Sequence, residues 1–287
     1  MFEVLRDDYP IQTARRYRAS TLTSYSLTVE RVVDVMRERL DAPLTLDEMA
    51  EIAYLSPFHF NRTFRTITGL PPGEYLAALR LDAAKRMLLT TSLSVTDVCF
   101  DLGYASLGAF TTRFTQQVGL SPTRLRHVAK ALADEPLQPR IATHVDARRQ
   151  TTLLFGGARG VVIAPPTFAG PIFVGLFPKP IPQGQPAACV TLLAPGHFQT
   201  NAAPDGTYYA LAAAAPFSQD ALTYLTPNAR VLVAVSPRPV VIRGGQANDS
   251  ISLTLRPLDP TDPPILGVFP PLLTAPAAMR ALSPGFN

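Results

Sequence analysis

The first half of this chain carries one helical pattern twice, and this repeat constrains the fold more than any other feature. The segment Ser56–Pro72 aligns without gaps on Ser106–Pro122. The matching positions include Phe60 with Phe110, Phe64 with Phe114, Gly69 with Gly119, Leu70 with Leu120 and Pro72 with Pro122. Phenylalanines four residues apart share a helix face, glycine favours a helix C-terminus, and proline favours the first turn of the next helix. Each copy therefore predicts an amphipathic helix that ends at its glycine.

A second match lies just upstream of each copy. Leu44–Ala50 resembles Leu93–Cys99, and each has a hydroxyl residue able to cap a helix with an acid three residues later. Each also places apolar residues on one face, which indicates a short helix before a tight turn. Gly103 suits that turn in the second copy, and Tyr54 stands in the equivalent place in the first. Helix, tight turn and helix, given twice, predict two helix-turn-helix units.

Three further helices complete a predicted helical domain over residues 27–132. Pro72–Thr90 has apolar residues at helical spacing, so we expect a long, stiff helix between the two units. An amphipathic helix precedes the first unit, through Val29, Val33, Met36 and Leu40. Residues 122–132 supply the last helix. Seven helices thus account for 27–132, with residues 1–26 as an N-terminal arm.

Composition indicates a second domain of another class. Of the 26 Lys and Arg residues, 19 precede residue 151, whereas 21 of the 29 prolines follow it and no Glu does. Residues 133–150 are polar and are predicted to be a linker, which leaves 151–287 as the second domain. The net charge of +4 does not by itself identify a nucleic-acid binder.

The second domain is predicted to be an antiparallel β-sandwich, so the whole chain is multidomain, α followed by β. Short apolar runs alternate with Pro, Gly, Asn and Asp, as in small sandwiches and barrels. The runs are Thr151–Phe155, Val161–Ile163, Ile172–Leu176, Ala188–Leu193, Tyr208–Ala213, Arg230–Val235 and Ser250–Leu255. Segments such as 171–175 and 204–209 loosely resemble the carboxypeptidase-regulatory, transthyretin-like sandwich modules.

The helical half resembles the DNA-binding domain of the AraC/XylS family of transcription regulators. The second copy has that family's signature in order: Gly103-Tyr104, Ser106, Phe110, Arg113-Phe114, Gly119, Ser121-Pro122 and Arg126. The resemblance implies that the second helix of each unit enters the major groove of double-stranded DNA. Adjacent groove segments lie about 34 Å apart, so one chain would occupy a non-palindromic site of about 20 base pairs.

In the first unit, the helix from Pro57 is expected to bury its aromatic face and expose the remaining residues. The resemblance places groove contacts at Phe58, Asn61 and Arg62. Arg pairs with guanine edges, Asn with adenine, and an apolar ring with a thymine methyl. Arg65 is a candidate phosphate contact, and His59 is either another or an ordinary surface histidine. The alternative for Arg62 is a solvated surface charge.

The second unit offers fewer hydrogen-bonding groups to the bases. Its candidate contacts are Ser106, Leu107, Gly108, Thr111, Thr112 and Arg113. The threonines can make methyl or hydroxyl contacts, and Arg113 is either a phosphate anchor or a partner in a surface ion pair. We therefore expect the first unit to discriminate bases more strongly, and the second to contribute shape fit and backbone affinity.

The sequence gives no sign of an enzyme, a cofactor or a metal site. Cys99 and Cys189 lie far apart, and Cys99 falls in an apolar helical pattern typical of a buried thiol. The charged N-terminus and the prolines within 161–177 argue against a signal peptide and a membrane span. A cytoplasmic protein is expected. RNA polymerase, and a small molecule or protein for the β-domain, are further candidate partners.

Two other functions stay open. An architectural or interaction protein would use the same DNA-binding module without sensing an effector. An enzyme targeted to DNA ranks last, since the Pro-Cys-His-Arg signature of the fused repair alkyltransferases is absent.

Overall fold

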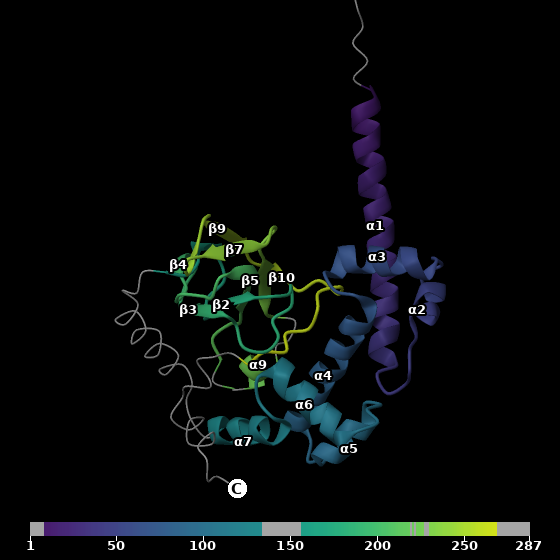
Figure 1. Cartoon of the computed structure of the whole chain (residues 1–287), viewed down its shortest axis with the longest axis vertical. Coiled ribbons are helices and arrows are strands. Elements are labelled where there is room, and N and C mark those ends of the chain that lie inside the picture. The colour runs from purple at the N-terminus through teal and green to yellow at the C-terminus, as the bar shows by residue number, and fades with distance from the viewer. Residues whose placement is uncertain (1–8, 134–155, 219, 221, 227–229, 269–287) are drawn as a thin grey trace, which may run out of the picture.

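The computed structural model describes residues 9–133, 156–218, 220, 222–226 and 230–268, and the side chains from Ser24 onward. A helical region and a β-sheet region lie side by side, and the first helix extends beyond both (Figure 1). None of the helices in the described part of the chain combines the length and apolar character needed to cross a membrane.

Seven helices form the first region, as the sequence predicted. They are α1 (Tyr9–Glu38), α2 (Leu46–Ile52), α3 (Pro57–Thr68), α4 (Pro72–Thr90), α5 (Val95–Asp101), α6 (Leu107–Val118) and α7 (Pro122–Ala133). The helix expected from about residue 27 begins instead at Tyr9, within the segment predicted to be an arm. Pro10 occupies its first turn, where no N–H is needed, and no glycine or further proline follows before Glu38.

The predicted helix ends carry the expected caps. Thr45 and Ser94 each form a full capping box, with Glu48 and Asp97 respectively. Gly69 and Gly119 end α3 and α6 at φ values of 80° and 90°, the left-handed region that glycine adopts without strain. Each cap contributes about 1 kcal/mol of helix stability, so the boundaries of these helices are encoded locally.

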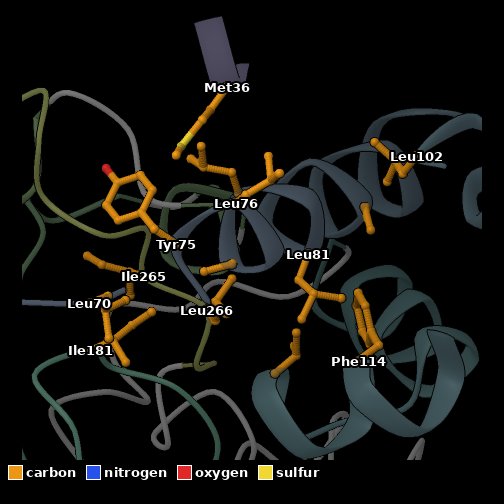
Figure 2. Close-up of a cluster of buried hydrophobic side chains, with 14 of the residues drawn as sticks. Met36, Leu70, Tyr75, Leu76, Leu81, Leu102, Phe114, Ile181, Ile265 and Leu266 are labelled. Atoms are coloured by element: carbon orange, nitrogen blue, oxygen red, sulfur yellow. The ribbon is translucent and has the colours of Figure 1, made fainter. Parts of the chain in front are cut away.

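The repeat places the same aromatic pair inside each unit. Phe60 and Phe64 have no exposed surface and their ring centroids lie 5.4 Å apart. Phe110 and Phe114 repeat this arrangement at 5.6 Å. Helix α4 runs between the two units and joins their cores, with Leu76 and Leu81 among the buried side chains shown in Figure 2.

In the described residues of the second region there are ten short strands and one helical turn, α9 (Leu222–Leu225). The strands are β1 (Arg159–Ile163), β2 (Ile172–Phe177), β3 (Ala188–Leu192), β4 (Gly196–Gln199), β5 (Gly206–Ala214), β6 (Leu232–Val235), β7 (Val240–Arg243), β8 (Gln246–Ala247), β9 (Ile251–Thr254) and β10 (Arg256–Pro257). One sheet has the order β4-β1-β9, and the larger one β10-β6-β5-β2-β3, with β7 on β5 and β8 on β7. The pairs are antiparallel except β1 with β9, which run parallel.

Six of the predicted strands coincide with β1, β2, β3, β5, β6 and β9, and Thr151–Phe155 lies outside the described residues. The sequence missed β4, β7, β8 and β10. These strands are short, with four residues in β4 and β7 and two in β8 and β10. In β4, for example, only Phe198 is buried.

Strand β2 is buried on both faces, and this position joins the two regions. Its side chains at 172, 174 and 176 pack into an apolar cluster shared with the smaller sheet. Phe173 and Phe177 point to the opposite face and belong to the same buried cluster as the helical cores. One apolar cluster therefore runs from the helix-turn-helix units into the larger sheet.

Candidate DNA-binding surface

Helix α3 buries one face and leaves the other open. Phe60, Phe64 and Thr68 point inward. The predicted contacts are all exposed, namely Phe58, His59, Asn61, Arg62 and Arg65. Phe58 is 81% exposed, which is unusual for an aromatic side chain and leaves it free to meet a ligand surface.

Helix α6 repeats this arrangement. Phe110, Phe114 and Val118 point inward. The predicted contacts Ser106, Leu107, Gly108, Thr112 and Arg113 are exposed, and Thr111 is half-buried. The Ser106 hydroxyl accepts the N–H of Ala109 and so caps the helix, in the way that Ser56 caps α3 through the N–H of His59.

The cations on these outer faces are available to an external anion. Within the described part of the chain, Arg62, Arg65 and Arg113 form no ion pair and donate no side-chain hydrogen bond. Arg113 is therefore not held in a surface ion pair there. Unpaired guanidinium groups on a protruding helix suit phosphate or guanine edges.

His59 differs from its neighbours because its ring is partly held. The ring of Tyr25 in α1 lies 5.6 Å from that of His59, tilted by 54°. The long helix α1 thus packs beside the N-terminal turn of α3, and it restricts the orientation of this one predicted contact.

Tyr54 is a residue of this surface that the sequence reasoning did not select as a contact. It occupies the turn between α2 and α3 at φ 55°, and its ring is 86% exposed. The guanidinium of Arg31 lies 6.0 Å from the ring centroid. The available signal was its alignment with Gly103, which has φ 72° in the equivalent turn.

Two half-buried arginine side chains bind backbone carbonyls of the helical region instead of facing outward. Arg80 of α4 donates to the carbonyl oxygens of Leu40 and Ala42, both at 2.7 Å. Arg126 of α7 donates to the carbonyls of Leu88 and Leu93, at 3.0 and 2.7 Å. The first arginine ties α4 to the chain before α2, and the second ties α7 to the chain before α5.

The helical region matches known DNA-binding proteins. A family model described as a helix-turn-helix domain matches residues 49–127. The regulatory protein SoxS of Salmonella typhimurium is 32% identical over 104 residues, which are 36% of this chain and 97% of SoxS.

A second relative is the bifunctional transcriptional activator/DNA repair enzyme AdaA of Bacillus subtilis. It is 35% identical over 102 residues, 34% of this chain, and this chain spans only 48% of the length of AdaA.

Two solved structures are also similar. The DNA-binding domain of AdpA, a global transcriptional factor, in complex with a target DNA has 34% identity and a TM-score of 0.33, and the match covers 34% of this chain and 88% of that chain. An AraC-type transcriptional regulator from Chromobacterium violaceum has 25% identity and a TM-score of 0.34, covering 35% and 90% respectively.

Proposed function

This chain belongs to the AraC/XylS family of transcription regulators, and from that premise we propose that it regulates transcription by inserting α3 and α6 into adjacent segments of the major groove of one DNA duplex. The observation that carries the proposal is the shared exposure pattern of the two helices. Each helix buries its two phenylalanines and exposes most of the residues on its outer face. A buried apolar face and an open outer face are what the recognition helix of a helix-turn-helix unit needs.

The two helices divide the work unequally in this proposal. Arg62 and Asn61 of α3 read guanine and adenine, and Phe58 meets a thymine methyl. Arg65 and His59 contact phosphates and set the register. On α6, Arg113 anchors a phosphate. Its remaining contacts, which are smaller or less polar, follow the shape of the groove: Ser106, Leu107, Gly108, Thr111 and Thr112.

Selection of bound duplexes from a random pool tests this function. We expect a recovered site with two conserved blocks about 10 base pairs apart, the more strongly conserved block lying under α3. Binding of similar affinity to every duplex would contradict the proposal and favour the architectural alternative, which uses the same module without choosing a sequence.

We also propose that the chain has no enzymatic activity, although AdaA is named as a repair enzyme as well as an activator. An alkyl acceptor needs an accessible thiolate. Cys99 is fully buried, and burial raises the pKa of its thiol. Cys189 lies within β3, and its backbone N–H donates a hydrogen bond to the side-chain oxygen of Asn201.

For the second region we propose a β-sandwich as a separate domain after a linker over 133–150. Val162 and Leu253 of the smaller sheet share one apolar cluster with Val174 and Ala212 of the larger sheet, as the facing layers of a sandwich do. A role for this domain in binding an effector or RNA polymerase, and the cytoplasmic location, remain predictions.

A further inference from the structure

One loop of the second region contacts the C-terminal ends of both recognition helices. This bridging loop, residues 178–187, connects β2 to β3. At α3, the side chain of Pro180 lies against Gly69, so that a Cβ on this glycine would stand 3.0 Å from Pro180 Cγ. At α6, the N–H of Gly184 donates to the carbonyl of Gln117 at 2.5 Å.

The bridging loop is also anchored in the apolar cluster of the helical region. Ile181 at its centre is 1% exposed. It belongs to the same cluster as Leu70, which follows α3, and Ile265, and the three lie together in Figure 2. The loop thus places an almost completely buried side chain beside the residue that follows α3.

A second segment, which we call the strap (residues 258–268), fastens the loop to α4. The N–H groups of Leu266 and Gly267 donate to the carbonyl of Pro182, at 3.1 and 2.9 Å. Lys85 of α4 is fully buried, and its Nζ donates to the carbonyls of Ile265 at 2.7 Å and Leu266 at 3.2 Å. A buried ammonium group is costly unless it is hydrogen-bonded, so these carbonyls and Lys85 hold each other in place.

Further contacts extend along α4 to its N-terminus. The Tyr75 hydroxyl donates to the carbonyl of Asp262 at 2.8 Å. Lys179 of the bridging loop forms an ion pair with Glu74 at 2.6 Å. This explains a feature that two DNA-binding units alone leave unexplained: the five consecutive residues 75–79 of α4 are all buried, because the helix is enclosed on all sides.

We propose that the bridging loop and the strap together act as a wedge that fixes the distance between α3 and α6, and that the second domain thereby sets the spacing of the two DNA half-sites. The inference rests on the proposed function for its consequence at DNA, but the wedge itself is a property of the protein. Helix α4 has 19 residues, about 28 Å, and helices of this length bend. One base pair of spacing is only about 3.4 Å, so a bend of a few ångströms at α4 changes which half-sites both helices reach.

Two glycines give a matched test. Gly184 has φ +67°, and a Cβ there would stand 2.8 Å from the carbonyl oxygen of Gln116. Gly244 has φ +58° in the turn between β7 and β8, and a Cβ there meets nothing within 4 Å. Gly184→Ala and Gly244→Ala therefore carry the same kind of backbone strain, and only the first pushes the loop away from α6.

The direct measurement is the distance between spin labels on the two recognition helices in the full chain without DNA. Labels at Thr66→Cys and Thr115→Cys use exposed positions outside the proposed contacts, with Cys99 and Cys189 replaced by Ala. The labelled protein with no further substitution and the labelled Gly244→Ala variant should each give one narrow distribution of the distance between the labels. The labelled Gly184→Ala variant should give a broader or shifted distribution. Identical distributions in all three would overturn the wedge. If Gly184→Ala fails to fold, Pro180→Ala replaces it, because this variant removes the contact at Gly69. It too should give a broader or shifted distance distribution, and an unchanged distribution would overturn the wedge.

The DNA measurement uses the selected site with its two blocks moved apart or together by one base pair. Wild type and Gly244→Ala should lose about tenfold in affinity at the altered spacings, and Gly184→Ala clearly less. The same loss in all three proteins would contradict the consequence for half-site spacing. Absence of sequence-selective binding by the wild type would instead refute the proposed function, and the label distances would still decide whether the wedge exists.

Discussion

The carbonyl group of Asp41 occupies the space that a side chain on Gly103 would need. A Cβ on Gly103 would stand 2.3 Å from the Asp41 oxygen, and the glycine has φ +72°. Asp41 lies in the chain before α2, and Gly103 lies in the turn between α5 and α6. The turn of the second unit therefore rests directly on the backbone of the first, and Arg80 holds the same stretch through the carbonyls of Leu40 and Ala42.

We expect Gly103→Ala to destabilise the protein more than Gly119→Ala. Both glycines have positive φ, which costs about 1–2 kcal/mol for alanine. Gly119 has open space around its Cβ position, whereas Gly103 also meets the Asp41 backbone. Urea denaturation should show a loss of about 1 kcal/mol for Gly119→Ala and at least about twice that for Gly103→Ala. Equal losses of unfolding free energy in the two variants would show that the Asp41 backbone moves aside without destabilising the protein.

Tyr54 should tolerate asparagine better than valine. Its φ of 55° lies in the left-handed region, where Asn is common and a β-branched residue is a true outlier. Because the ring is 86% exposed, little burial is lost in either variant. We expect Tyr54→Asn to change the free energy of unfolding by less than about 0.5 kcal/mol, and Tyr54→Val to lower it by about 1 kcal/mol or more. Equal stability of the two variants would contradict this reading of the turn.

Arg62 and Arg113 should have different effects on DNA binding. Arg62→Ala should cost about 1–3 kcal/mol and relax the base preference at one position of the selected site. Arg113→Ala should weaken binding similarly for all sequences. It should also make the slope of log affinity against log salt concentration shallower by the amount expected for about one phosphate contact. Titrations at several salt concentrations, on the selected site and on single-base variants of it, separate the two. An unchanged base preference in Arg62→Ala would remove the readout role.

Lys85 should make stability depend on pH in a defined window. Burial lowers the pKa of its ammonium group to about 8 from the ordinary value of 10.5, although Asp82 nearby raises it in part. Between these two values the unfolded chain binds more protons at this site than the folded one, so this group makes stability rise with pH. Below pH 8 the ammonium is charged in both states and contributes no slope.

The difference between wild type and Lys85→Met isolates this contribution from other groups. Burial raises the pKa of Tyr75, and this acts in the opposite direction, lowering stability above about pH 10 in both proteins. We therefore measure denaturant midpoints of both proteins at pH 7, 8, 9 and 10. Above pH 8, the stability of the wild type relative to Lys85→Met should rise with pH. Parallel curves would mean that the buried ammonium keeps its ordinary pKa.

Most helix boundaries and faces of the helical region could be predicted from the sequence, because the residues that specify them lie close together along the chain. The caps at Thr45 and Ser94, the glycines at 69 and 119, and the phenylalanines four residues apart act within one or two helical turns. The exposed faces of α3 and α6 followed from the same period, and the structure places every predicted contact there except the half-buried Thr111. Whether those side chains contact DNA stays a prediction.

The β region was less readable because its pairings are not local. The positions of six strands follow from short apolar runs. The parallel pairing of β1 with β9, which places Gly160 opposite Ile251, is not indicated by any pattern in either segment. The double burial of β2 also depends on the helices that cover its second face.

The sequence by itself determined two helix-turn-helix units, their ends and their outward faces, because periodicity and capping act between residues three or four positions apart. Only the tertiary structure decided how those units are held together. The carbonyls that accept hydrogen bonds from Lys85 lie 180 and 181 positions further along the chain, and the bridging loop that contacts α3 and α6 belongs to the β region. Such contacts depend on chain topology, and those of Lys85 and Gly184 use backbone groups that every residue carries, so no residue pattern in either segment specifies them.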